Sequence, residues 1–347
     1  MRTSISRQTC QSGFGLAEVM VALAIGLITT LVIMQVMINF EGQKRTTGGG
    51  ADAQTNGAIA LYSIQRRMQM AGFGLPVFSE QNQPLDCTDV AFDHDNNPAT
   101  PNLEPDLFPV TITDGGGGAS DTISVRVGPT QMGGIPVVLL NVDASDNSVG
   151  VANNLMCADG DIVLAVDGSV CRMSRVVDLP GPDRINLESA ADMNVGASFT
   201  CLGNWTETVY QVNANNLTEN GVVSVAGIVS LQAQYGVADS PSGHTVDAWV
   251  DATGSWVAPT VENRKRIKAV RVAVVARSAA VEATNVTDAC SSRTAASPTG
   301  LCAWEGTEAN PAPALDLSAE ANWRRYRYRV FETIIPLRNM IWSGGTL

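Results

Sequence analysis

The sequence predicts an α+β fold in which one long N-terminal helix precedes a β-rich region. Residues 19–38 form a run of twenty residues without a charged side chain. Residues 51–72 then place apolar side chains at helical spacing. From residue 73 onward, short apolar runs are separated by Gly, Pro, Asn and Asp, which is typical of antiparallel strands and their turns. Because helix and strands form separate blocks, we expect the helix to pack on one face of an antiparallel sheet.

The apolar run is long enough to cross a membrane. Twenty residues of helix rise about 30 Å, which is roughly the thickness of the hydrocarbon core of a bilayer. A core helix of a soluble protein would have a polar face, whereas only Thr29, Thr30 and Gln35 are polar here. A secretory signal has a shorter apolar segment followed by a small-residue cleavage site, whereas this run leads into INFEGQKR. We therefore predict a retained transmembrane helix over residues 14–40.

A short polar leader with two arginines precedes this helix. It occupies residues 1–13, ends in Gly13 and is followed by Phe14, and Glu18 is the fifth residue after that glycine. This order of leader, glycine, phenylalanine, glutamate and apolar run resembles the prepilin signature of type IV pilins and type II secretion pseudopilins. The resemblance implies cleavage between Gly13 and Phe14 by a prepilin peptidase on the cytoplasmic side, methylation of the new amine and retention of the helix.

The carboxylate of Glu18 is unusual at the start of an apolar helix. A charged side chain at membrane depth costs about 2.5 to 3.5 kcal/mol on insertion scales, so such residues normally have a partner. Cleavage would create one, the Phe14 ammonium, on the same chain or on a neighbour, and opposite charges attract strongly in a low dielectric. The resemblance assigns Glu18 to this pairing during filament assembly. The alternative is a carboxylate that simply lies at the headgroup boundary.

The second half of the predicted helix should support the β-rich region. The glycines in Thr46–Gly50 predict a bend or a short melted segment, because each is about 1 kcal/mol less favourable than Ala in a helix. Beyond them, one stripe gathers most of the apolar residues, and we expect it to lie against the sheet. Gly72 is a natural end for the helix. The stripe consists of Gly57, Leu61, Ile64, Met68 and Ala71.

Strands are predicted over residues 121–129, 160–177, 222–237 and 266–280. The last strand, RRYRYRVFETIIPL, alternates Tyr and Val with Arg325, Arg327 and Arg329, so one face should be buried and the other basic. An acidic partner protein could bind these arginines. In a chain with 34 acidic residues, we expect them to pair with carboxylates of the chain itself.

Seven cysteines occur, and Cys10 would leave with the leader, so an even six remain. An even number fits disulfide bonds in an oxidising periplasm. The pairs that are close in sequence are the simplest expectation, with the remaining two cysteines joined by elimination. The expected disulfides are Cys290 with Cys302, Cys157 with Cys171, and Cys87 with Cys201.

Metal and nucleotide motifs are weak. Calcium-loop positions 1, 3, 5 and 12 are occupied by Asp93, Asp95, Asn97 and Glu104, but Pro98 stands where a sharp turn requires Gly, so a solvated acidic loop is the stronger interpretation. Zinc is not expected, because there is no CxxC pair and the chain has only two histidines. The GGGG run at 115–118 lacks the Lys and Ser/Thr of a phosphate loop and reads as a flexible turn.

Composition narrows the function classes. The chain has 347 residues, 45% of them hydrophobic, which is enough for a substantial core and for two subdomains. The formal charge of −12 becomes −12 − 2 = −14 when the two arginines of the leader are removed. An acidic body argues against nucleic-acid binding, which depends on clustered Lys and Arg. No GxSxG or HExxH motif is present, so neither catalysis nor a cofactor is expected.

The resemblance becomes narrower in the β-rich region. The segments NGAIALYSIQRRMQMAGFG, SDTISVRV, GDIVLAVDG and RIKAVRVAVVARSA, with the final YRYRVFETIIPLRNMIW, are similar to the PilW family of type IV pilus minor pilins over about half of the chain. This similarity implies a type IV pilin-like fold with a removed leader at 1–13, a long helix at 14–72 and a periplasmic β-rich domain at 73–347.

The resemblance also implies a role. The protein would be a low-copy subunit, held in the bacterial inner membrane by a single pass, that primes pilus assembly near the filament tip. Its partners would be other minor pilins, the major pilin, the prepilin peptidase, the inner-membrane assembly platform and a large tip protein. The J-type minor pseudopilin of type II secretion is the nearest alternative. A second alternative is a tip-located adhesive module formed by residues 79–119 and 281–322.

Overall fold

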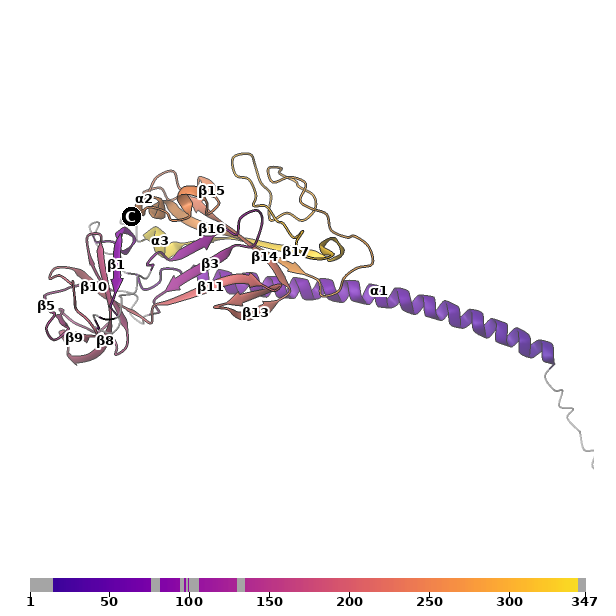
Figure 1. Ribbon diagram of the computed structural model, residues 1–347, viewed down its shortest axis with the longest axis horizontal. Helices are drawn as coiled ribbons and strands as arrows, with labels where there is room; N and C mark the ends of the chain where they lie inside the picture. The colour runs from indigo at the N-terminus through magenta and orange to yellow at the C-terminus, as the bar shows by residue number, and fades with distance from the viewer. Residues whose placement is uncertain are drawn as a thin grey trace, which may run out of the picture.

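The computed structural model describes residues 15–75, 82–93, 97, 99, 106–129 and 135–342. One helix of 54 residues, α1 (Leu16–Gln69), carries a β-rich body on its C-terminal half, while its N-terminal half projects away from that body (Figure 1). Helix and sheets are therefore segregated as the sequence predicts, and the α+β pilin-like fold class is confirmed.

The predicted break in the helix is wrong, because α1 continues through Thr46–Gly50. The glycines of its body-facing side allow close packing instead of bending. A Cβ on Gly49 would lie 3.3 Å from the Cβ of Ser278, and a Cβ on Gly57 would overlap the ring of Phe331. The loss of helix propensity at these glycines is therefore offset by contact between α1 and the sheet.

Two antiparallel sheets form the part of the body that contacts α1. The five-stranded sheet has the order β13 (Val222–Ala226), β12 (Asn216–Glu219), β11 (Thr206–Asn213), β3 (Thr122–Val127) and β2 (Val110–Thr113). The four-stranded sheet has the order β15 (Ala248–Val250), β14 (Ile228–Val237), β16 (Ile267–Arg277) and β17 (Tyr328–Pro336).

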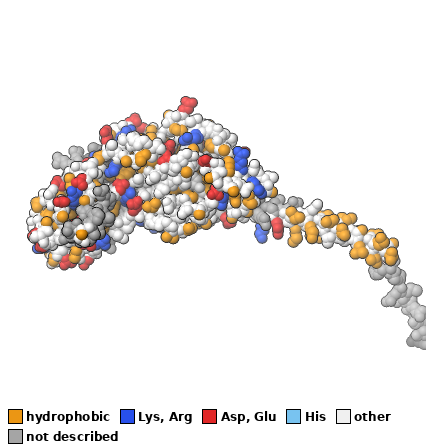
Figure 2. Space-filling view, in the orientation of Figure 1, with side chains coloured by type: hydrophobic (Ala, Val, Ile, Leu, Met, Phe, Trp, Pro, Cys, Tyr) orange, Lys and Arg blue, Asp and Glu red, His pale blue; other side chains and the backbone are white. Residues whose placement is uncertain are grey.

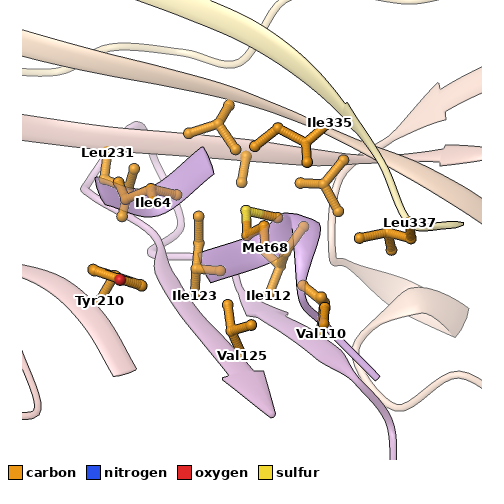
Figure 3. Packing of buried hydrophobic residues seen from close by; sticks show 14 of the residues in the cluster. Ile64, Met68, Val110, Ile112, Ile123, Val125, Tyr210, Leu231, Ile335 and Leu337 are labelled. Carbon is orange, nitrogen blue, oxygen red and sulfur yellow. The ribbon is translucent and has the colours of Figure 1, made fainter. Parts of the chain in front are cut away.

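The core lies where α1 enters between these two sheets. Ile64 and Met68, both from the predicted stripe, are fully buried and pack with Ile123 of the five-stranded sheet and Ile335 of the four-stranded sheet (Figure 3). One helix thus supplies core residues to two sheets, and this burial is the main stabilising contact between α1 and the body.

A third sheet forms a separate unit with the order β4 (Val137–Val138), β10 (Ser198–Gly203), β7 (Ile162–Asp167), β8 (Val170–Gly181), β9 (Arg184–Leu187), β6 (Ser148–Gly150) and β5 (Asn141–Asp143). Strand β1 (Asp89–Phe92) runs parallel to β8. The Leu139 N–H donates to Ala197 O at 3.0 Å, and the Leu140 N–H donates to Gly150 O at 2.8 Å. The chain between β4 and β5 therefore closes the sheet into a small barrel, the distal barrel (residues 135–203).

The distal barrel lies beyond the C-terminal end of α1, at the opposite end of the molecule from the projecting half of the helix (Figure 1). It is inserted between the neighbouring antiparallel strands β3 and β11. The Gly72 N–H donates to Arg126 O at 2.9 Å and the Gly128 N–H donates to Phe73 O at 2.7 Å, so the chain after α1 is joined to the end of β3. These bonds connect the barrel to the end of the helix.

The long connection between β16 and β17, residues 278–327, covers the outer face of the four-stranded sheet. Val275 packs with Leu301 and Leu317, and Ala273 packs with Trp304. Strand β16 is therefore buried on both faces. The remaining short helices are η1 (Pro84–Asp86), η2 (Gly254–Trp256), α2 (Val261–Arg266), η3 (Trp323–Arg325) and α3 (Arg338–Trp342).

All six cysteines of the predicted set form disulfides, but two of the expected pairings are wrong. Cys87 is joined to Cys171 and Cys157 to Cys201, whereas Cys290 is joined to Cys302 as expected. The reason is the alternation of side chains across a sheet. Cys201 lies among the residues of the barrel interior, and Cys171 lies in the cluster on the opposite face, so Cys157 on the interior side cannot reach it.

Candidate functional site

The projecting half of α1 is the most unusual surface of the molecule. Leu16–Ile38 has a mean hydropathy of 2.5, and none of it is buried inside the structure. By length and composition it is the one helix in the described part of the chain that could cross a membrane. Exposed apolar surface costs about 25 cal/mol per Å² in water, so this segment requires lipid or other helices around it.

Glu18 lies in the first turn of α1. The Gly15 N–H donates to the Glu18 Oε2 at 3.3 Å, which satisfies one of the free N–H groups at the start of the helix. The helix dipole also favours a carboxylate at this end. Gly13 and Phe14 lie outside the described residues.

The polar side chains inside the apolar segment are satisfied within the helix. The Thr29 hydroxyl donates to Ile25 O at 2.7 Å, and the Thr30 hydroxyl donates to Gly26 O at 3.0 Å. Hydroxyls bonded to their own backbone do not require water, so they are compatible with a lipid environment.

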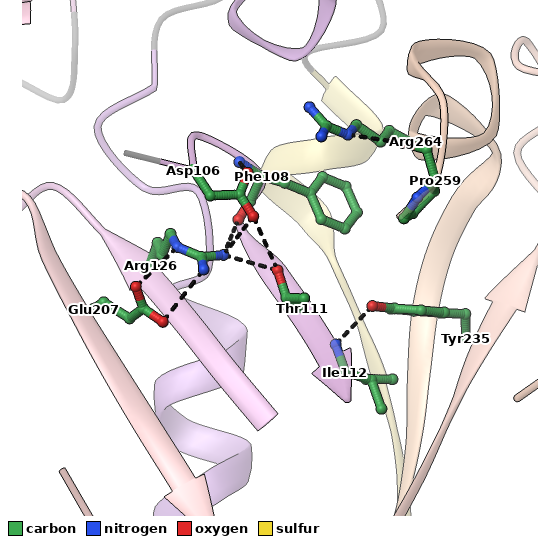
Figure 4. Close-up of polar contacts among 9 residues, drawn as sticks. All are labelled: Asp106, Phe108, Thr111, Ile112, Arg126, Glu207, Tyr235, Pro259 and Arg264. Carbon is green, nitrogen blue, oxygen red and sulfur yellow. Dashed lines mark hydrogen bonds and ion pairs between the residues drawn. The ribbon is translucent and has the colours of Figure 1, made fainter. Parts of the chain in front are cut away.

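A buried arginine fixes the base of the distal barrel (Figure 4). Arg126, 7% exposed, donates two hydrogen bonds to Glu207 at 3.2 and 3.3 Å and forms an ion pair with Asp106 at 3.2 Å. It also donates to Phe108 O and to the Thr111 hydroxyl, each at 2.8 Å. Arg126 lies in β3, before the inserted barrel, and Glu207 lies in β11, after it. Their contact therefore joins the two strands that lead into and out of the barrel.

Two further polar groups connect the proximal sheets. The Ile112 N–H on the edge of β2 donates to the Tyr235 hydroxyl at 2.6 Å, and burial raises the pKa of Tyr235 to about 12. The Asp121 carboxylate accepts the Gly115 N–H at 3.0 Å and the Ala233 N–H at 2.8 Å. Burial raises the pKa of Asp121 to about 7, and the nearby Asp114 and Asp251 act in the same direction. These groups hold two sheets together.

The calcium pattern stays a prediction, because Asp95 and Glu104 lie outside the described residues. Of the other two positions, Asp93 follows β1, and the Asn97 side chain accepts the Ala99 N–H at 3.0 Å. Within the described ranges, no group of three His, Cys, Asp or Glu side chains is placed to hold a metal ion.

The basic strand near the C-terminus is partly paired within the chain. Glu282 accepts from the Arg327 Nε at 2.7 Å through its carboxylate and from the Arg325 Nε at 2.7 Å through its backbone carbonyl. Sequence reasoning expected such partners without identifying them. It missed the Arg126 network completely, although one signal was present: a single arginine in the apolar strand TISVRV must be paired if it is buried.

Comparison with known families agrees with this arrangement. The family model of type IV pilus-assembly protein W (PilW) matches residues 202–339, and the prokaryotic N-terminal methylation motif matches residues 8–34. No curated protein and no solved structure matches the chain significantly. Both matched families are structural rather than catalytic, and most of the distal barrel lies outside both matches. A helix that carries the methylation motif is joined to a body that matches PilW in one pilin-like fold, and the two matches together support a PilW-like type IV pilus protein.

Proposed function

We propose that the protein is a minor pilin that takes part in starting type IV pilus assembly and remains at or near the filament tip. The observation that supports this role is the position of the distal barrel beyond the end of α1 (Figure 1). Helices that bundle in a filament core lie about 8 to 10 Å apart, so successive subunits overlap along the axis. A barrel that extends past its own helix occupies the space of the next subunit, which suits the end of a filament.

The proposed pathway begins with a precursor in the bacterial inner membrane. The peptidase removes residues 1–13, the Phe14 amine is methylated, residues 14–40 stay in the membrane, and the domain at 73–347 folds in the periplasm. The disulfides support an oxidising compartment. Other pilus components are its partners, specifically the remaining minor pilins, the major pilin, the assembly platform and a large tip protein.

A second candidate role is adhesion at the tip. Residues 79–119 and 281–322 meet where the Asp316 N–H donates to Gly118 O at 3.0 Å, which supports one surface built from both segments. The distal barrel would add to it from the far end of the molecule.

Deletion of the gene separates these roles. If the protein primes assembly, the deletion strain should lack surface pili. If it is an adhesin, the strain should have normal pili that fail to attach. If it is a J-type pseudopilin, the strain should have a secretion defect with pili intact. The control is complementation with the intact gene. Normal piliation and normal attachment in the deletion strain would reject both proposed roles.

A further inference from the structure

The end of the body from which α1 emerges has a basic surface on an acidic protein. Residues 322–331, NWRRYRYRVF, contain four arginines and no Asp or Glu, whereas the whole chain has 34 acidic and 22 basic residues. Figure 2 shows Lys and Arg side chains at the end of the body where the helix leaves it. Concentrating positive charge at one end of an acidic molecule gives that end a distinct set of possible partners.

The arginines lie beside the first part of α1 that the body covers. A groove of about 530 Å³ is lined by Gly50, Ala51, Ala53 and Gln54 of α1, by Val286, and by Arg327 and Arg329. Gly50 is 12 residues, or about 18 Å of helix, past Ile38, the end of the apolar segment. The headgroup region takes up roughly 5 to 8 Å of that distance, so about one Debye length separates the groove from the lipid phosphates.

Two of the four guanidinium groups are free to bind an anion. Glu282 engages Arg325 and Arg327. Arg324 stacks over Trp323 at 5.3 Å, and Arg329 is exposed; neither side chain has an ion pair or hydrogen bond within the part of the chain that is described.

Apolar side chains accompany these cations. Val281 is 46% exposed and Val286 is 37% exposed, and the backbone N–H of Val286 donates to Arg324 O at 2.8 Å. Arginines beside Trp and exposed aliphatic groups are typical of protein surfaces at the membrane–water interface. We call Arg324, Arg329, Trp323, Val281 and Val286 the basic end.

We propose that the basic end binds anionic phospholipid headgroups of the leaflet from which α1 emerges, and so holds the body against the membrane until the subunit enters a filament. This inference rests on the proposed insertion of α1. Lipid is favoured over an acidic neighbouring protein because the anchoring helix itself sets the distance between the basic end and the headgroups. The acidic remainder of the body is repelled from the same surface, which orients the basic end toward it.

The test is hydrogen exchange of the full-length protein in nanodiscs of phosphatidylcholine alone or mixed with phosphatidylglycerol. Peptides covering 281–291 and 321–330 should exchange several-fold more slowly in the anionic discs, and about 0.5 M salt should remove the difference. Peptides of the distal barrel should exchange equally in both. Failure to enter either disc would reject the membrane anchor and the docking together, whereas entry with equal exchange would reject only the docking.

Charge-reversal variants identify the residues. Arg324→Glu with Arg329→Glu should abolish the slowing. The control, Arg66→Glu with Arg338→Glu, makes the same charge change at exposed arginines without side-chain partners in the described ranges, and Arg66 lies 28 residues, or about 42 Å of helix, past Ile38. Equal loss in the control would overturn the proposal. Slowing that requires another purified pilin but not anionic lipid would also overturn it, in favour of an acidic protein partner.

Discussion

At the level of single residues, a few buried polar groups bond neighbouring strands within an otherwise apolar core. Arg126 should contribute most, because its burial leaves its partners dependent on it. Arg126→Met removes the cation and leaves Glu207 and Asp106 without it, so we expect a loss of about 2 kcal/mol or more of unfolding free energy. Thermal denaturation measures this, with exposed Arg66→Met as the control. Equal melting temperatures for the two variants would show that the network does not stabilise the fold.

Asp121 should make stability depend on pH. The pKa of Asp121 in the folded protein, about 7, exceeds the ordinary value of 3.8. The contribution of Asp121 to the free energy of unfolding is therefore complete below the unfolded pKa and is lost as the pH rises through the folded pKa. Asp121→Asn loses one acceptor but cannot ionise. The melting temperature of wild type should exceed that of the variant most at about pH 4, and the gap should shrink toward about pH 8. A gap that stays constant between about pH 4 and pH 8 would contradict this.

Glu18 should matter for assembly and not for insertion. Glu18→Ala removes a charge from an apolar helix, so the variant should reach the membrane fraction as well as wild type does. It should nevertheless co-purify poorly with the other pilins, because the proposed partner of the Phe14 amine is lost. Thr29→Ala is the control, since the Thr29 hydroxyl bonds the backbone of its own helix. Normal co-purification of Glu18→Ala would reject charge pairing as the role of this residue.

At the level of elements, local sequence patterns predicted the long helix and several strands, but not the closing of the distal barrel by residues far apart in the sequence. The helical stripe containing Ile64 and Met68 and the short apolar runs of strands such as β7 and β16 are encoded in neighbouring residues, so they could be found in the sequence. The barrel depends on the bond between Leu139 and Ala197, which is 58 residues further along the chain, and such a separation leaves no local signal. Two of the predicted disulfide pairings were wrong for the same reason, because separation in sequence does not show which face of a sheet carries a cysteine.

The distal barrel should be separable from the rest of the body. Thr206 pairs directly with Val127, so a two-residue Asn-Gly turn can replace residues 128–205, with Cys87→Ser to remove the cysteine left unpaired. We expect this variant to keep the helix and the two proximal sheets and to restore pili in the deletion strain. Circular dichroism and pilus counts measure this. A folded variant that restores no pili would show that the barrel itself is required for assembly.

At the scale of the whole molecule, three regions lie in sequence along one axis (Figure 1). The exposed apolar segment of α1 occupies one end, the two sheets around α1 lie in the middle, and the distal barrel occupies the other end. Helix packing in a filament can accommodate the first two regions in every subunit. The third region projects past the helix, which supports the proposed position at the filament tip, where no further subunit follows.

Labelling of sheared pili with gold-conjugated antibody against the distal barrel tests that placement most directly. The barrel lies at the end away from the helix core, so its epitopes should stay accessible in an assembled filament. We expect label at one end of each filament and none along the shaft. Regular decoration along the shaft would contradict it, because the protein would then be a repeating subunit and the barrel would not prevent stacking.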